Sequence, residues 1–365
     1  ENYFQQEVNY NIDVKLDDVK HTLTAKETIQ YINNSKSGLS FIYFHLWPNA
    51  YKNTGTALAQ QMLEHKNTSL YFSDPAERGF IDSLDFYVDG VKANWEYDPK
   101  HIDICRVILP KELAPGDTII ISTPFYVKIP DARFSRLGHT EQAYFMTQWY
   151  PKPAVFDKDG WHPMPYLDQG EFYSEFGSFD VRITLPQNYL LAATGDRIDA
   201  KEEEQFIASK ISETKTFLQR DTFGFMLMRF PPSSEKWKTV RFVQQRVHDF
   251  AWFADKRFLV LKGEVEMPLS KKKVDTWIYF TGKNSSLWKN ALDYVNDATL
   301  FYSALVGDYP YNHVTAVDGT IMAGGGMEYP NITVIGDAGD AMSLDLVITH
   351  EVGHNWFYGI LGSNE

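Results

Sequence analysis

Apolar and polar residues alternate strictly near the start of the chain, in the segment EVNYNIDVKL. A period of two predicts a strand with one buried and one solvated face, as in an antiparallel sheet. The side chains expected on the buried face are Val8, Tyr10, Ile12, Val14 and Leu16. Further runs of this kind are TLTAKETIQYIN, PGDTIIISTPFYVKI, FDVRITLPQNY, VRFVQQRV and VDTWIYFTG. The chain up to about residue 280 is therefore predicted to be mainly β, with a single early helix in GTALAQQMLEH.

The pattern changes after Gly282, where helical spacing replaces alternation. Apolar residues recur every three or four positions from Ser285 to Gly307, with a serine to cap the start and a glycine to end the helix. A strand is then expected in YPYNHVTAVDG, followed by a strand interrupted by glycines in TIMAGGGMEYPNITVIGD. The last helix is predicted from Ser343 to about Tyr358, where Gly359 ends it.

The length of 365 residues suggests two or three domains. The change of pattern predicts a mainly β domain over residues 1–265 and an α+β region over residues 266–365. The formal net charge of −13 disfavours nucleic acid as a partner, because phosphate binding needs a basic surface. No apolar run reaches the length of about 18 residues that a membrane-spanning helix requires.

Two features bear on the cellular compartment. Cys105 is the only cysteine, so no disulfide can form within the chain, although many exported proteins of this size need none. The sequence starts without an initiator methionine, which is compatible with processing after export. We leave the compartment open, with a preference for the periplasm or cell envelope of a bacterium.

The last predicted helix contains HEVGH at residues 350–354. His350 and His354 project from one helix face about one turn apart, so both imidazoles can reach one Zn2+ at about 2.0–2.1 Å. Glu351 lies about 100° around the helix from His350 and can take a proton from an attacking water without ligating the metal. An apolar stripe on the opposite face consists of Leu344, Ile348 and Val352. The alternative, two histidines on a solvated face, fits this amphipathic helix less well.

A tetrahedral zinc site needs a third protein ligand. The elongated motif H-E-x-x-H-x-x-G-x-x-H is excluded, because Phe357 and Ile360 stand where it requires glycine and histidine. The remaining common solution is a glutamate from a following helix. Glu365 is the only acidic residue after His354, and its role stays open because it lies behind the helix-breaking segment GILGSN.

The segment AGGGMEYP precedes the zinc helix by some twenty residues. Glycines in a strand mark a close approach of the backbone by another group, often a ligand. Glu328, directly behind the glycines, would then be held at that approach. A glycine-containing bulge is the alternative for this segment taken alone, and the zinc motif downstream favours the first interpretation.

The two motifs in this order resemble those of the aminopeptidase N family of zinc metallopeptidases, the gluzincins. That family carries G-[AG]-M-E-N ahead of H-E-x-x-H, and this chain has GGMEY at residues 325–329 and HEVGH at residues 350–354. Weaker similarities lie in VHDFAWFA, LAPGDTIIISTPFYVKI and FMTQWYPKPAVFD. The resemblance therefore spans essentially the whole chain.

The resemblance implies a saddle-like N-terminal β domain followed by a thermolysin-like catalytic domain. It implies that His350 and His354 bind one zinc ion, that Glu351 is the general base, and that Glu328 binds the free α-amine of a peptide substrate. The backbone expected to run beside the substrate like an added strand belongs to Gly325, Gly326 and Met327.

Three departures from the family pattern matter. The third zinc ligand and a catalytic tyrosine should follow beyond the last residue, so we expect the catalytic domain to be truncated here. Tyr329 replaces the asparagine of the first motif. In the family's T-Q-x-[QE] segment the chain has Gln148 but Tyr150, where a second amine-binding amide or acid should stand. Tyr150 could offer its hydroxyl to a substrate or pack as an interface aromatic.

Two functions from different classes follow. The first is zinc-dependent peptide hydrolysis, in particular the removal of N-terminal residues from peptides. The second is a non-catalytic peptide-binding or scaffold module, which the missing third ligand motivates. The epoxide-hydrolase activity of one branch of the family has no support from a particular residue.

Overall fold

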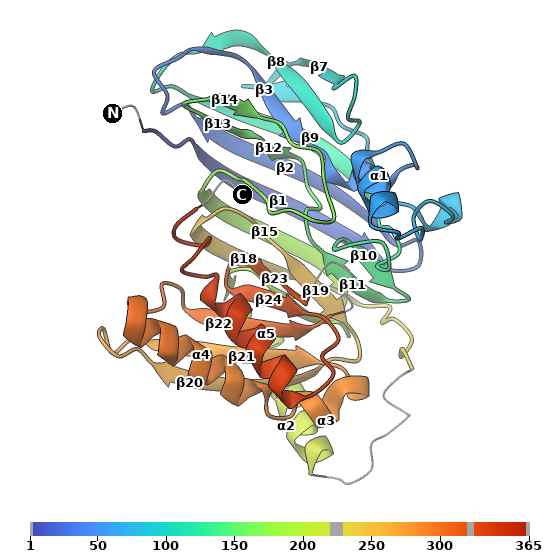
Figure 1. The fold of residues 1–365 in the computed structure, drawn as a ribbon, viewed down its shortest axis with the longest axis vertical. Coiled ribbons are helices and arrows are strands. Elements are labelled where there is room, and N and C mark those ends of the chain that lie inside the picture. The colour runs from blue at the N-terminus through green and yellow to red at the C-terminus, as the bar shows by residue number, and fades with distance from the viewer. Residues whose placement is uncertain (1–2, 220–228, 320–324, 363–365) are drawn as a thin grey trace.

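The computed structural model describes residues 3–219, 229–319 and 325–362 (Figure 1). Sheets of the N-terminal part occupy the upper half of Figure 1, and a sheet with two helices on its face occupies the lower half. Strands predominate in the first part and most helical residues follow later, so the expected fold class is confirmed in general terms.

The largest sheet runs in the order β17-β18-β15-β1-β2-β9-β5-β6, with β4 pairing to β9. Its strands are β1 (Glu7–Asp17), β2 (Thr22–Ile32), β4 (Phe80–Asp82), β5 (Tyr87–Val88), β6 (Val91–Lys92), β9 (Thr118–Lys128), β15 (Gly177–Pro186), β17 (Asp196–Ile198) and β18 (Trp237–Val247). β1 lies inside this sheet, antiparallel to β2 and parallel to β15. The five alternate residues predicted for its buried face are all buried, which confirms the alternation argument.

Two four-stranded sheets and a two-stranded ribbon complete the β part. One sheet has the order β12 (Lys152–Pro153), β3 (Leu39–His45), β8 (Ile104–Leu113), β7 (Asn94–Tyr97). The other has the order β10 (Gly138–Thr140), β11 (Ala143–Met146), β19 (Trp252–Asp255), β16 (Leu190–Ala193). The ribbon consists of β13 (Val155–Asp157) and β14 (Gly160–His162).

The five-stranded sheet of the C-terminal part has the order β20-β21-β22-β24-β23. Its strands are β20 (Leu259–Glu266), β21 (Lys273–Phe280), β22 (His313–Asp318), β23 (Gly326–Tyr329) and β24 (Ile332–Ile335). β21, β22 and β24 are parallel, whereas β20 and β23 run antiparallel at the two edges. β20 runs across the expected domain limit at residue 265, so we propose an earlier limit, before Leu259.

The helices are α1 (Ala57–Glu64), α2 (Lys201–Leu218), α3 (Ser285–Trp288), α4 (Ala291–Val306) and α5 (Ala341–Gly353). Short 3-10 turns are η1 (Trp47–Tyr51), η2 (Pro75–Glu77) and η4 (Gly282–Asn284). α4 and α5 pack together and cover one face of the five-stranded sheet (Figure 1). None of the helices in the described part of the chain has the length and apolar character needed to cross a membrane.

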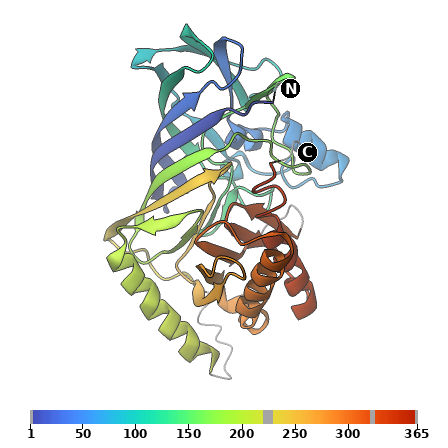
Figure 2. The same ribbon diagram turned by 90° about the vertical axis from the view of Figure 1, so that its left-hand side faces the viewer.

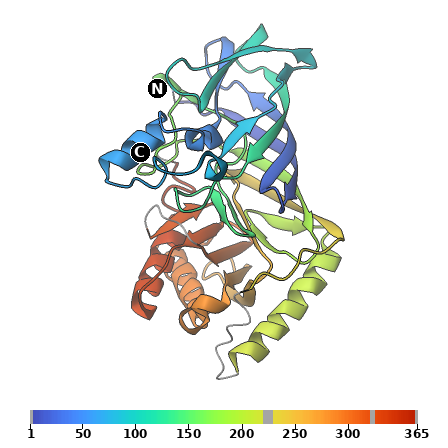
Figure 3. The same cartoon turned by 90° about the vertical axis from the view of Figure 1, so that its right-hand side faces the viewer.

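α2 corrects the prediction that the early chain holds only one helix. Its buried residues are Glu203, Ile207 and Thr214, and four partly buried apolar side chains pack against the core beside them, those of Phe206, Ile211, Phe217 and Leu218. An apolar stripe at helical spacing is therefore present, although charged residues outnumber it. Polar contacts add to this packing, such as the 3.0 Å hydrogen bond from the backbone N–H of Val260 to Oγ1 of Thr214. Figures 2 and 3 show α2 on the side of the molecule away from α4 and α5.

The glycine-interrupted strand is in fact a hairpin. β23 and β24 pair antiparallel, with Tyr329 opposite Ile332. The turn between them places Asn331 in the left-handed region, at φ 51°, which asparagine tolerates better than most residues. Residues 320–324, which include the first glycine of the predicted strand, Gly324, lie outside the described residues.

Glu27 on β2 is a buried carboxylate in the N-terminal core. It has no exposed surface, and neither carboxylate oxygen has a hydrogen-bond partner among the described residues. Burial raises the pKa of Glu27 well above the ordinary value of 4.5. The folded protein therefore keeps a proton that the unfolded chain loses, so this residue lowers stability increasingly as the pH rises above 4.5.

Glu27→Gln should stabilise the protein at pH 8 more than at pH 5. The difference in the free energy of unfolding between Glu27→Gln and the wild type should grow by about 1.4 kcal/mol per pH unit, until the pH reaches the pKa of Glu27 in the folded protein. Urea unfolding at both pH values measures it, with Glu112→Gln on the exposed face of β8 as the matched control. If the free energy of unfolding changed with pH equally in the wild type and in Glu27→Gln, the carboxyl group of Glu27 would not be destabilising.

Candidate metal centre

α5 carries the predicted zinc motif and is anchored at its start and along one face. The side chain of Asp340 accepts a 2.8 Å hydrogen bond from the backbone N–H of Ser343 and caps the helix. The predicted apolar stripe, which is fully buried, consists of Leu344, Ile348 and Val352. The opposite face of α5, which carries the two histidines, therefore points away from the core.

α5 ends at Gly353, earlier than the predicted end near Tyr358. Asn355 donates a 3.0 Å hydrogen bond from Nδ2 to the carbonyl of Val352, which competes with continued helical bonding. Tyr358 then takes φ 101°, outside the helical region. His354 is the C-cap and keeps helical dihedral angles (φ −64°, ψ −14°), so the spacing of the motif retains its helical geometry.

The imidazoles of His350 and His354 converge. Their Nε2 atoms lie 3.1 Å apart, with the ring planes at 87°. Nδ1 of His354 lies 3.0 Å from the carbonyl oxygen of Phe357, so in the tautomer that donates this bond Nε2 is left as the free acceptor. A backbone carbonyl that orients the far nitrogen in this way is the usual support of a metal-ligating histidine.

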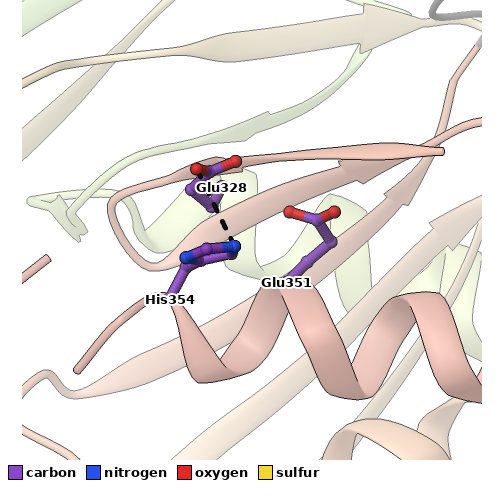
Figure 4. A group of neighbouring side chains, drawn as sticks. All are labelled: Glu328, Glu351 and His354. Atoms are coloured by element: carbon purple, nitrogen blue, oxygen red, sulfur yellow. Dashed lines mark ion pairs between the residues drawn. The ribbon is translucent and has the colours of Figure 1, made fainter. Parts of the chain in front are cut away.

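Glu328 on β23 and Glu351 on α5 face the same space beside His354 (Figure 4). Potential ligand atoms of Glu328, Glu351 and His354 all lie within 4.8 Å of one another. Oε1 of Glu328 is 3.9 Å from Nε2 of His354. The structure therefore brings together the zinc-motif residues and the acid behind the glycines, which are separated in the sequence.

Gly326 explains how strand and helix come this close. A Cβ at this position would lie 2.4 Å from Oε1 of Glu351 and 2.6 Å from its Cδ, well inside contact distance. Gly325 differs, because a Cβ there would meet only Val347, at 3.6 Å. The requirement for glycine is thus specific to residue 326, where the backbone lies against the proposed base.

Glu351 is held in a protonation state unusual for a glutamate. Burial, reinforced by the carboxylates of Glu328 and Glu171, raises its pKa to about 9. Oε2 of Glu351 has no hydrogen-bond partner among the described residues, and the residue is only 5% exposed. A nearby cation would act in the opposite direction and stabilise the ionised carboxylate.

The other predicted site residues lie behind this centre. Gln148 is buried, and its Oε1 accepts a 2.9 Å hydrogen bond from the hydroxyl of Tyr329. Tyr150 is also buried and donates a 2.8 Å hydrogen bond to Oδ1 of Asp249. Met327, a residue of β23, is also buried. Glu365, the open candidate for a third ligand, lies outside the described residues.

A cleft of about 540 Å³ opens over the centre. The lining residues given by the two motifs are Gly325, Gly326, Met327, Glu328, His350, Glu351 and His354. Leu346 and Val347 of α5 also line it, and sequence reasoning missed four lining residues from the N-terminal part, Arg136, Gln169, Gly170 and Glu171. They come from connections between strands of the N-terminal part, where no periodic pattern or motif marks a site.

The donor set fits a zinc ion. Two ligands at about 2.0–2.1 Å in tetrahedral geometry lie about 3.3 Å apart, close to the 3.1 Å between the two Nε2 atoms. The unpartnered, buried Oε2 of Glu351 is a further group that a cation or a polar ligand would satisfy. His350 and His354 are the residues that would hold the ion, with carboxylates of Glu328 and Glu351 beside it.

No model of a known protein family matches the chain, and no curated protein matches it. Solved structures do. An M1 zinc metallopeptidase from Deinococcus radiodurans is 13% identical, with a TM-score of 0.56, covering 98% of this chain and 65% of that chain. A mutant of a two-domain M1 zinc metallopeptidase with bound L-tryptophan is 12% identical, with a TM-score of 0.56, covering 98% of this chain and 66% of that chain.

A third neighbour, a mutant of the Deinococcus radiodurans enzyme with a bound Tyr-Ser-Ala substrate, has a TM-score of 0.56 and 13% identity, covering 97% of this chain and 65% of that chain. At this level of identity the likeness concerns the fold. It agrees with the fold that the sequence resemblance implies. The chain spans about two thirds of the length of these neighbours.

Gly326→Ala should destabilise the protein by about 1–3 kcal/mol, the usual cost of overpacking a close contact. Gly325→Ala is the matched control and should change stability by less than about 0.5 kcal/mol, since its Cβ has room. Urea unfolding of the two variants measures the difference. Equal effects would mean that β23 is not held against Glu351 in solution.

Proposed function

We propose that the protein is a zinc-dependent peptidase that removes N-terminal residues from peptides. The observation that carries this proposal is the convergence of His350, His354, Glu351 and Glu328 in one cleft. The likeness to M1 zinc metallopeptidases supports the reaction class at the level of the fold. The expected cofactor is one zinc ion and the expected partner is a peptide substrate.

Each residue of the centre has a role that its position allows. His350 and His354 hold the ion through Nε2, and the carbonyl of Phe357 keeps the ring of His354 in place. When bound, zinc polarises the carbonyl under attack and lowers the pKa of a nearby water. Glu351 accepts a proton from the attacking water and later returns it to the leaving amine, as a general base and acid does.

The edge of β23 offers a place for the substrate backbone. β23 is the last strand of its sheet and pairs with β24 on one side only among the described strands. Gly325 and Gly326 leave its backbone accessible at the cleft, so an extended peptide can add to this edge through main-chain hydrogen bonds. Glu328, two residues further along, is then placed to bind a protonated amine by a charge-assisted hydrogen bond.

Glu351→Gln should abolish peptide hydrolysis and leave zinc binding intact, because the amide cannot accept the proton while both imidazoles remain. His350→Ala and His354→Ala should each lose the metal as well. Zinc content after dialysis and hydrolysis of a peptide by the full-length protein measure the two effects. Loss of metal in Glu351→Gln, or retained hydrolysis, would contradict the assigned roles.

Glu328→Gln should lower kcat/KM for peptides with a free N-terminus by about 10- to 100-fold, the range for a hydrogen bond to a charged group. The same peptides carrying an N-acetyl group should be poor substrates of the wild type, and the variant should not change their rate. Equal cleavage of free and acetylated peptides by the wild type would refute amine recognition but leave the zinc site untouched.

A further inference from the structure

The cleft contains one carboxylate that neither sequence motif supplies. Glu171 belongs to the connection between β14 and β15 and lines the cleft together with Glu328 and Glu351. Glu171 therefore faces the reacting centre from the N-terminal part of the molecule, opposite the strand and helix that carry the motifs.

The backbone on the N-terminal side of Glu171 is held by α1. The side-chain amide of Gln61 forms two hydrogen bonds with the backbone of Gln169, accepting from its N–H at 2.9 Å and donating to its carbonyl at 3.0 Å. Oδ1 of Asp168, one residue earlier, accepts a 2.6 Å hydrogen bond from the hydroxyl of Ser135. These contacts fix the chain immediately before Gly170.

The backbone on the C-terminal side is held by the segment that follows α5. The hydroxyl of Tyr358 donates a 2.6 Å hydrogen bond to the carbonyl of Phe172. The ring of Phe172 packs against Trp47, with centroids 4.9 Å apart, and under the guanidinium of Arg136 at 5.2 Å. Glu171 thus stands between two anchored residues, as a side chain built into a site does.

The charges around the cleft favour a cationic group in it. Even with Glu351 protonated, the acidic side chains of Glu171 and Glu328 outnumber the one guanidinium in the lining, that of Arg136. Oε2 of Glu351, on a residue only 5% exposed, lacks a hydrogen-bond partner among the described residues. A protonated amine carries three donors and one positive charge, which matches acceptors that approach it from different sides.

The position where the family pattern places a second amine-binding group does not reach the cleft. Tyr150 is buried and its hydroxyl is bonded to Asp249. Gln148 is bonded to Tyr329. An acid that arrives from another connection is therefore the available partner for Glu328 on the N-terminal side of the cleft.

We propose that Glu171 is a specificity-determining residue that, together with Glu328, binds the protonated N-terminal amine of the substrate. This inference rests on the proposed peptidase function and adds to it the residue that replaces the missing anchor at position 150. Glu171 makes no contribution to bond cleavage itself, so its effect is confined to substrates that carry the charge.

Glu171→Gln tests the proposal in the zinc-loaded full-length protein, with trialanine and N-acetyl-trialanine as probes. We expect kcat/KM for trialanine to fall by about 10- to 100-fold, while the rate for the acetylated peptide and the zinc content stay unchanged. Glu64→Gln, at the exposed end of α1, is the matched control and should alter neither rate. Because both acids hold one ammonium group, Glu171→Gln and Glu328→Gln should be non-additive in the double variant.

The outcomes separate the two proposals. An equal loss for both peptides would mean that Glu171 only positions Arg136 or its own loop, and would overturn the inference alone. A protein that binds no zinc or cleaves neither peptide would overturn the proposed function instead. Should Glu171→Gln fail to fold, Glu171→Asp keeps the charge but withdraws it by one methylene, and it should still impair trialanine selectively.

Discussion

The close contact between the backbone at Gly326 and the carboxylate of Glu351 is the constraint on which the centre depends. A single methyl group at residue 326 would lie 2.4 Å from Oε1 of Glu351. The absence of a side chain lets the edge strand β23 lie directly against the last turns of α5. Glu328, Glu351 and His354 fall within 4.8 Å of one another only because that separation is so small.

Asn331 holds the same two elements from the other end. Its backbone N–H donates a 2.9 Å hydrogen bond to Oδ1 of Asn355, just past the zinc motif. Its side chain accepts from the N–H of Gly195 at 2.9 Å and donates to Oε1 of Gln244 at 2.8 Å. One fully buried residue therefore connects the hairpin to the end of α5, to the β16–β17 connection and to β18. An unpaired amide at this buried position would be costly.

The elements that the sequence predicts are those whose hydrophobic pattern is local and strong. The alternation in β1 and the helical spacing in α4 are local patterns produced by burial, so both elements are confirmed. α2 has an apolar stripe too, but only three of its residues are fully buried and its first turn carries three glutamates, so the pattern is weak and the helix was not predicted. The early end of α5 escaped prediction because the side chain of Asn355, which bonds back to the carbonyl of Val352, is held in place by Asn331 and Tyr309, which are remote in sequence.

The residues of the site also fall into a predictable and an unpredictable group. Two sequence motifs predict the roles of His350, Glu351, His354 and Glu328. Arg136 and Glu171 lie in connections between strands, and only the fold brings them to the cleft.

The buried surroundings of Tyr150 explain why position 150 does not supply an acidic side chain to the cleft, whereas the connection that carries Glu171 does. The hydroxyl of Tyr150 lies 2.8 Å from Asp249, which also pairs with the buried ammonium of Lys152 at 3.2 Å. A carboxylate at position 150 in that orientation would face the charge of Asp249 in a buried setting, where like charges strongly disfavour each other. Tyr150 instead donates a hydrogen bond to Asp249, which also pairs with Lys152. The second acidic side chain of the cleft comes instead from Glu171, on a loop held by α1 and by Tyr358.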